Sequence, residues 1–146
     1  MRKVMITIVL LLISIGFAAC STADNRGSQK AVSSQADPSK ASSYTNIKPE
    51  EAKKRLESEK GSILLDVRTQ EEYDEKHIPN SLLIPVDVIE KEAPAKLTDK
   101  NATIFVYCRS GRRSVTASET LVKMGYTNVY NLGGIIDWPY ETESGK

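Results

Sequence analysis

The stretch Ala102-Thr-Ile-Phe-Val-Tyr-Cys108, followed directly by Arg109-Ser-Gly-Arg-Arg-Ser114, decides the fold of this chain. Its first part is the most β-prone segment of the sequence, because isoleucine, phenylalanine, valine and tyrosine follow one another. Its second part is a short loop, and residues 113–124 are expected to form a helix. A strand, a loop and a helix in this order predict a parallel sheet with the loop at the carboxyl end of the strand.

Cys108 lies where this strand ends and the helix begins. Unpaired backbone N–H groups and the positive end of the helix dipole favour a negative charge at a helix N-terminus. Three arginines in the loop act in the same direction. Since the thiolate is the nucleophilic form of cysteine, we predict that Cys108 is a reactive nucleophile. The alternative is a buried thiol that only packs at the end of the strand.

Helices and strands alternate on both sides of this segment. Further helices are expected at residues 49–57, 69–76 and 86–93, and further strands at 62–66, 81–85 and 128–132. Pro49 suits the start of the first helix, and Gly125 suits the end of the helix that follows Cys108. The pattern predicts an α/β fold with three layers, in which helices flank a central, mostly parallel sheet.

The first 43 residues have a different composition. Arg2 and Lys3 precede an apolar run that is shorter than the roughly 20 residues of a membrane-spanning helix, so residues 1–19 are expected to be a secretory signal. The end of this run, Phe17-Ala-Ala-Cys20, resembles the bacterial lipobox, which implies lipidation of Cys20. An ordinary cleaved signal and an uncleaved anchor are the alternatives. The polar residues 20–43 predict a flexible tether, and residues 44–146 one domain.

These features predict a protein of the cell envelope, lipid-anchored to a bacterial membrane and facing outside the cytoplasm. Once Cys20 is lipidated, Cys108 is the only free thiol, which indicates either intermolecular pairing or a reactive group. With His77 as the only histidine, no metal site and no cofactor are expected. The formal net charge is +1 and no long basic run lies outside the cysteine loop, so nucleic-acid binding is not expected.

Three blocks of sequence follow one another in a fixed order. The blocks are Leu65-Asp-Val-Arg68 with Glu72-Tyr73, His77-Ile-Pro79, Ser81 and Pro85; the loop Cys108–Ser114; and Asn131-Leu-Gly-Gly134 with Trp138. Together they resemble the rhodanese family of sulfurtransferases in its single-domain form. Lys76 and Asn80 stand where the family often has glycine. Since asparagine tolerates a positive φ, we expect Asn80 to preserve the turn.

The resemblance implies that sulfane sulfur moves from a donor such as thiosulfate to a thiophilic acceptor, through a persulfide on Cys108. The amides of the loop, which includes Ser110 and Gly111, would cradle an anion. Each remaining residue then has an implied role. Arg109 and Arg112 would attract a small anionic donor, Arg113 would hold the loop, Ser114 would cap the helix or donate to the sulfur, and Asp66 and Arg68 would support the scaffold. The acceptor would be a thiol or a protein.

Related phosphatases and arsenate reductases of this fold have one more residue between the cysteine and the arginine. Here four residues separate Cys108 from Arg113, which favours sulfur transfer. Two alternatives stay open: a redox or persulfide relay, and an interaction module without turnover that docks an envelope protein. We interpret His77 as support for a turn rather than as a general base. Glu71 and Glu72 are expected to be solvated at a helix start, and Trp138 and Tyr140 to pack.

Overall fold

The computed structural model of the protein describes residues 43–145. The predicted signal peptide, Cys20 and all of the predicted tether except Ser43 lie outside the described residues. In the part of the chain that the structure describes, no helix combines the length and the apolar character needed to cross a membrane.

Five strands form one sheet in the order β1-β5-β4-β2-β3, and every pairing between neighbouring strands is parallel. The strands are β1 (Thr45–Asn46), β2 (Ile63–Asp66), β3 (Leu82–Leu83), β4 (Thr103–Cys108) and β5 (Asn128–Gly134). The strand that ends at Cys108 is the middle strand of this order. The parallel α/β fold is confirmed.

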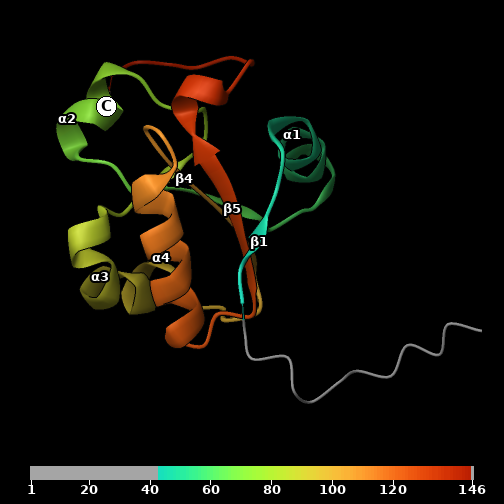
Figure 1. Ribbon diagram of the computed structural model, residues 1–146, viewed down its shortest axis with the longest axis vertical. Coiled ribbons are helices and arrows are strands. Elements are labelled where there is room, and N and C mark those ends of the chain that lie inside the picture. Colours follow the sequence, from blue (N-terminus) through green and yellow to red (C-terminus); the bar gives the residue numbers. More distant parts are fainter. Residues whose placement is uncertain (1–42, 146) are drawn as a thin grey trace, which may run out of the picture. The chain divides into compact units, whose positions relative to one another are not determined.

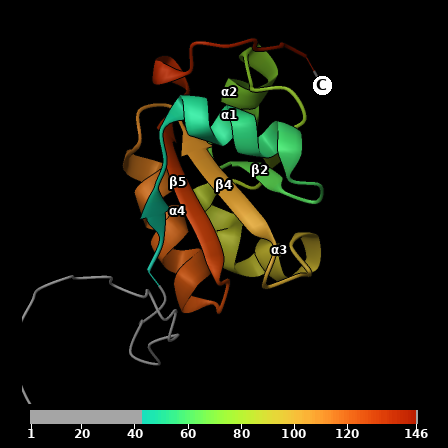
Figure 2. The same ribbon diagram turned by 90° about the vertical axis from the view of Figure 1, so that its right-hand side faces the viewer.

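Helices cover both faces of the sheet (Figures 1 and 2). The helix α1 (Pro49–Ser58) lies on one face, whereas α3 (Ile89–Lys96) and α4 (Arg112–Lys123) lie on the other. A short helix, α2 (Gln70–Glu75), follows β2 near the carboxyl ends of the strands. This gives the three layers that the sequence predicts.

The structure departs from the predicted elements in several places. The helix expected at 86–93 is a 3₁₀ turn, η1 (Val86–Val88), that leads into α3 and shifts the helix toward Lys96. The turn is closed by i→i+3 hydrogen bonds, because the N–H of Val88 donates to the carbonyl of Pro85 and the N–H of Ile89 donates to the carbonyl of Val86. The short strand β1 and the 3₁₀ turn η2 (Ile135–Asp137) were not predicted, because elements of two or three residues show no periodicity. Finally, β5 continues through both glycines, which the sequence analysis placed after the strand.

The core consists of two apolar clusters, one on each face of the sheet. Successive residues of β4 point to opposite faces. Ile104, Val106 and Cys108 belong to the cluster beneath α3 and α4, whereas Phe105 and Tyr107 belong to the cluster on the side of α1. The same alternation that builds the core therefore directs the Cys108 side chain toward the face covered by α4.

The two positions where the family often has glycine differ in backbone conformation. Asn80 has a φ of 62°, so it adopts the left-handed conformation that we expected for it. Lys76 ends α2 with a φ of −165°, which is extended backbone that any residue adopts. The lysine is accommodated without strain for this reason.

Candidate active site

Cys108 is the last residue of β4, and the loop that follows it turns at once into α4. Gly111 is the N-cap of α4 and has a φ of 99°, a conformation that glycine adopts without steric cost. The turn brings its backbone N–H back onto the sulfur, with a distance of 3.1 Å between Gly111 N and Cys108 Sγ. The cysteine residue is only 1% exposed. The sulfur therefore lies at the base of a loop whose amide points inward.

The environment of Cys108 lowers the pKa of its thiol below the ordinary value. Burial acts in the opposite direction, because it disfavours the charged thiolate. Hydrogen bonds from the backbone N–H groups of Ser114, Gly111 and Ser110, together with the hydroxyl of Ser114, outweigh this effect and lower the pKa. The thiolate is thus stabilised chiefly by the amides at the start of a helix.

The end of β5 forms the wall behind this loop. Gly134 is the register partner of Cys108, and a Cβ built on Gly134 would lie 2.6 Å from the carbonyl oxygen of Arg109. The loop can approach the strand this closely only because Gly134 has no side chain. The N–H of Ile136 also donates to the carbonyl of Arg109, at 3.3 Å. Gly134 belongs to one of the family-like blocks of the sequence, but no local signal there indicates this packing role.

Ser114 lies in the first turn of α4 and is buried. Its hydroxyl lies within hydrogen-bond distance of two carbonyl oxygens, at 2.8 Å from Gly111 and at 3.2 Å from Gly133. Two roles were expected for Ser114. The role of helix cap is wrong, because the N-cap is Gly111, which forms no side-chain cap. The expected donation to the sulfur agrees with the contribution of Ser114 to the lowered pKa of Cys108. A glycine with positive φ replaces the usual polar cap, so the first amides of α4 stay available to the sulfur.

Arg113 forms a two-point ion pair with Glu72 of α2. The Nη1–Oε2 distance is 2.7 Å and the Nη2–Oε1 distance is 2.8 Å. The expectation of a solvated Glu72 is therefore wrong. This carboxylate also completes a capping box with Thr69, and the pair with Arg113 is the main cause that lowers the pKa of Glu72 to about 2. The Thr69-x-x-Glu72 spacing is a sequence signal of that capping box, although it does not reveal the contact with Arg113.

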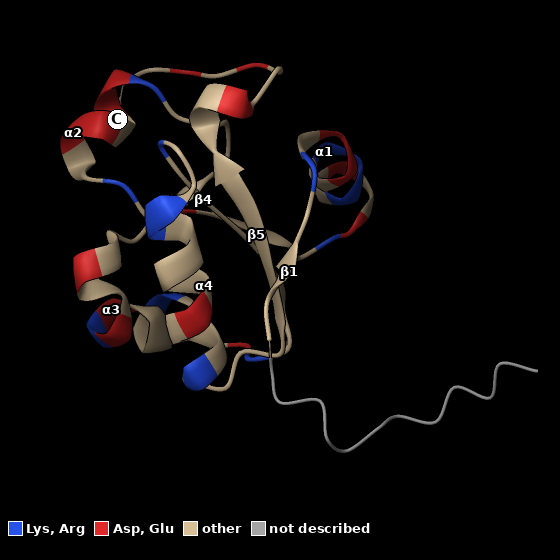
Figure 3. Cartoon of the chain, in the orientation of Figure 1, with Lys and Arg blue, Asp and Glu red and all other residues tan. Residues whose placement is uncertain are grey.

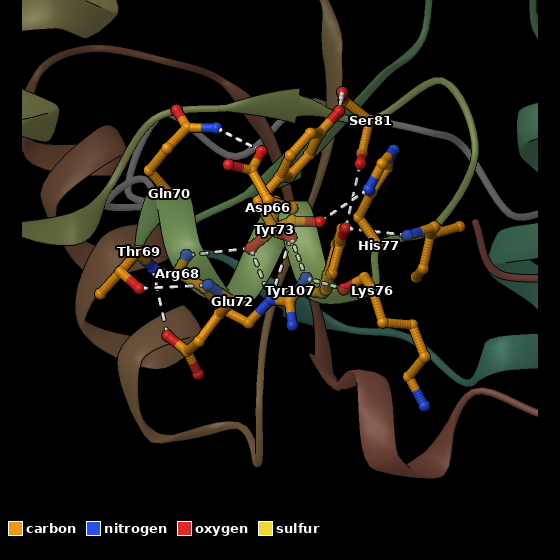
Figure 4. Close-up of polar contacts among 12 residues, drawn as sticks. Asp66, Arg68, Thr69, Gln70, Glu72, Tyr73, Lys76, His77, Ser81 and Tyr107 are labelled. Atoms are coloured by element: carbon orange, nitrogen blue, oxygen red, sulfur yellow. Dashed lines mark hydrogen bonds and ion pairs between the residues drawn. The ribbon is translucent and has the colours of Figure 1, made fainter. Parts of the chain in front are cut away.

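Asp66 and Arg68 form a buried ion pair beside the loop (Figure 4). The Nη2 atom of Arg68 lies 2.6 Å from Asp66 Oδ2 and also 2.6 Å from the carbonyl oxygen of Lys76. Asp66 is 0% exposed and Arg68 is 4% exposed, so removal of either charge would leave the other buried without a counter-ion and would destabilise the fold. The scaffold role predicted for this pair fits these contacts, which join the end of β2 to the end of α2.

A cavity of about 380 Å³ opens next to this group. Basic residues and isoleucines line much of it, together with two glutamates of α2. The lining residues are Arg68, Lys76, Arg109, Ile135, Ile136, Glu72 and Glu75. Arg68 therefore lines the cavity in addition to pairing with Asp66. Its position at the cavity was not predicted from the sequence.

The charged groups around the loop differ in how they are paired. Arg109 and Arg112 are exposed, whereas Arg113 is partly buried against Glu72. Figure 3 shows the basic start of α4 and the acidic residues of α2. Two of the three loop arginines are thus presented to solvent, where they can attract an anion.

His77 is buried and engaged in structural contacts. Its ring stacks on Tyr73 with 3.8 Å between centroids, and its two nitrogens lie 2.8 Å from the carbonyl oxygen of Tyr73 and 3.1 Å from a carboxylate oxygen of Glu143. These contacts agree with the interpretation of His77 as support for a turn. Trp138 is buried, as expected for a packing aromatic, whereas Tyr140 meets it edge-on but is exposed to solvent. Among residues 43–145, no three metal-ligating side chains are grouped together.

The chain resembles known proteins in sequence and in fold. A model described as the rhodanese-like domain matches residues 48–140. The chain is 39% identical over 104 residues to a putative sulfur carrier protein of Bacillus subtilis, an alignment that covers 70% of this chain and 55% of that protein. It is 41% identical over 73 residues to a thiosulfate sulfurtransferase of Escherichia coli, covering 50% of this chain and 70% of the relative.

A solved structure also resembles this chain. It is a rhodanese with anions from Escherichia coli, which aligns with a TM-score of 0.55 and 37% sequence identity. The alignment covers 57% of this chain and 99% of that structure. This chain therefore spans nearly all of one single-domain structure but only about half the length of the Bacillus protein.

Proposed function

The chain belongs to the rhodanese-like domain family, and on that premise we propose that it transfers sulfane sulfur through a persulfide on Cys108. One observation carries the proposal: the Cys108 sulfur accepts a backbone N–H of the loop, in surroundings that lower the pKa of its thiol. Near neutral pH, a larger fraction of such a thiol is in the nucleophilic thiolate form than of an ordinary cysteine. Relatives named as sulfurtransferases support this assignment.

The proposed reaction has two steps. In the first, the Cys108 thiolate attacks the outer sulfur of a donor such as thiosulfate. A new S–S bond forms on the enzyme, the S–S bond of thiosulfate breaks, and sulfite leaves with the electron pair of that bond. In the second step, a nucleophilic acceptor attacks the outer sulfur of the persulfide and releases the Cys108 thiolate. No external oxidant or reductant is needed, and the cycle predicts ping-pong kinetics.

The side chains around the loop suit a small anionic donor. Arg109 and Arg112 are exposed and would draw the anion toward the loop. Arg68 and Lys76 line the adjacent cavity and would hold the departing sulfite charge. The inward-pointing amide of Gly111 would stabilise the negative sulfur both before and after the transfer.

A persulfide relay to a protein partner is the second candidate function. One relative is named as a putative sulfur carrier protein, which favours this reading. The near-complete burial of Cys108 also favours an acceptor that reaches the sulfur through a defined approach. A mixed disulfide with an envelope protein that disappears in a Cys108→Ser variant would support the relay over turnover of small molecules.

We also propose that Cys20 carries the lipid that anchors the protein to a membrane of the cell envelope. Only the lipobox-like sequence before Cys20 supports this proposal. Metabolic labelling with a fatty acid tests it directly. Label is expected on the native protein and absent from a Cys20→Ser variant, and equal labelling of both would contradict it.

A steady-state assay tests the main proposal. With thiosulfate and cyanide as substrates, the purified protein is expected to form thiocyanate with parallel double-reciprocal lines, the pattern of a ping-pong cycle. A Cys108→Ala variant should lose this activity. Turnover that survives in this variant, or lines that intersect, would contradict a covalent cycle through Cys108.

A further inference from the structure

Glu72 is held on two sides. Its carboxylate accepts both hydrogen bonds from Arg113, and Oε2 also accepts the backbone N–H of Thr69 at 3.1 Å. The side chains of Arg113 and Glu72 are 27% and 24% exposed, so the pair is shielded from most of the solvent. A carboxylate fixed by its own helix start can hold a planar guanidinium in one orientation.

Arg113 lies in the first turn of α4, and the N-cap of the same helix, Gly111, donates its backbone N–H to the reactive sulfur. Its hydrogen bonds to Glu72 are the main cause that raises the pKa of Arg113, and the charges of Cys108 and Asp66 contribute to the same shift. Nevertheless, the described hydrogen bonds of the Arg113 side chain go to Glu72, whereas the sulfur is bound by a backbone N–H of the loop. The side-chain hydrogen bonds of Arg113 are therefore directed at Glu72 rather than at the sulfur.

We propose that Glu72 is a positioning residue of the Cys108 site that acts through Arg113. It orients the guanidinium and offsets its charge, so that backbone amides hold the sulfur anion. An arginine released from Glu72 would act on the thiolate directly. The pKa of Cys108 would then fall further, and the sulfur would become a weaker nucleophile because nucleophilicity falls with pKa.

Other charged groups face the same region, and the test must separate them from Glu72. From β2 and the residues after it come Asp66 and Arg68, which pair with each other. From α2 comes Glu75, and Lys76 and Arg109 also line the cavity. Glu75 is the matched control, since it belongs to the same short helix, lines the same cavity and carries the same charge. In the described residues its carboxylate forms no ion pair with Arg113.

The test measures the rate at which iodoacetamide alkylates Cys108 as a function of pH. It uses the full chain with Cys20→Ser, so that Cys108 is the only thiol. For Glu72→Gln, the pH midpoint is expected to fall by about 0.3 to 1 unit, which means roughly two- to tenfold more thiolate below the midpoint. Glu75→Gln is expected to shift it by less than half as much. In Glu72→Gln combined with Arg113→Gln, the midpoint should return toward that of the parent chain.

Three results would overturn the proposal. These are an unchanged or raised midpoint in Glu72→Gln, an equal shift in Glu75→Gln, and a shift that persists without Arg113. If Glu72→Gln does not fold, Arg113→Gln alone serves as the test: the unpaired carboxylate must raise the midpoint, and an unchanged value overturns the proposal. The inference rests on the proposed function for its significance. Because alkylation reports on Cys108 whether or not sulfur is transferred, the two can fail separately.

Discussion

Gly134 is paired with Cys108 across the β4–β5 ladder, and the backbone of the loop that follows Cys108 occupies the space where a side chain of residue 134 would lie. The carbonyl oxygen of Arg109 and the Cα of Ser110 would lie 2.6 Å and 2.8 Å from a Cβ at this position. Both contacts are with backbone, so a side chain here cannot be relieved by a change of rotamer. The shape of the loop around the sulfur therefore depends on a residue of the neighbouring strand.

Gly134→Ala is expected to displace the loop and to lower sulfur transfer by at least about tenfold, because small displacements at a reacting centre are costly. Overpacking of this kind should also destabilise the fold by about 1–3 kcal/mol. Turnover and urea unfolding measure the two effects. Gly61→Ala is the control, since Gly61 has a φ of 85° and open space around it, far along the chain from the loop. It should lose stability but retain activity; equal activity in both variants would contradict the packing role.

The buried pair of Asp66 and Arg68 predicts a large loss of stability when one partner is neutralised. Asp66→Asn leaves the guanidinium of Arg68 without its counter-ion and should lower the free energy of unfolding by about 3–5 kcal/mol. The control, Lys53→Met, breaks the exposed ion pair between Lys53 and Glu57, in which the two side chains are 40% and 63% exposed. It should lower the free energy of unfolding by less than about 0.5 kcal/mol. Urea denaturation compares the two. A loss below about 1 kcal/mol in Asp66→Asn would show that the buried pair is not needed.

The low pKa of Glu72 predicts how acid affects stability. Arg113 lowers this pKa from 4.5 to about 2, so the folded state binds this proton less readily than the unfolded chain does. The resulting stabilisation is fully present above about pH 5 and is lost as the pH falls toward 2. At pH 7, the free energy of unfolding of the native protein should exceed that of the Glu72→Gln variant by about 1–2 kcal/mol, after allowance for the partial exposure of the pair. This difference should shrink at pH 3; a difference that stays constant between these pH values would contradict the assignment.

The turn at Asn80 predicts a residue-specific effect on stability. Asn80 has a φ of 62°. This left-handed backbone conformation is unfavourable for alanine by roughly 1–2 kcal/mol, whereas glycine adopts it without steric strain. Asn80→Ala should therefore lower the melting temperature, and Asn80→Gly should leave it unchanged or raise it. At Lys76, where φ is −165°, a glycine should give no gain. Thermal unfolding of the three variants tests this, and a stabilising Lys76→Gly would show that the backbone there differs from this description.

The sequence predicts the parts of this protein that depend on local signals. The β-branched and aromatic run before Cys108 identifies the strand that leads into the loop, and the alternation of strands and helices identifies the parallel sheet. The thiol at a helix start indicates the candidate nucleophile. Elements that depend on distant contacts were missed: β1 has only two residues and exists through its pairing with β5.

The same distinction applies to the candidate site. The positions of Cys108 and of the loop follow from neighbouring residues. The partner of Arg113 does not, because Glu72 lies 41 residues earlier in the chain and meets it only in the folded state. The reach of Arg68 into the cavity and the packing of the loop on Gly134 are likewise set by the arrangement of the strands.

The most direct test of the account is the intact mass of the purified protein after brief exposure to thiosulfate without an acceptor. The native chain is expected to gain the mass of one sulfur atom, to lose it again when cyanide is added, and to show no gain as the Cys108→Ser variant. A protein whose Cys108 is alkylated readily, but which gains no sulfur from thiosulfate or from other sulfane donors, would contradict a persulfide on Cys108 as the basis of its function.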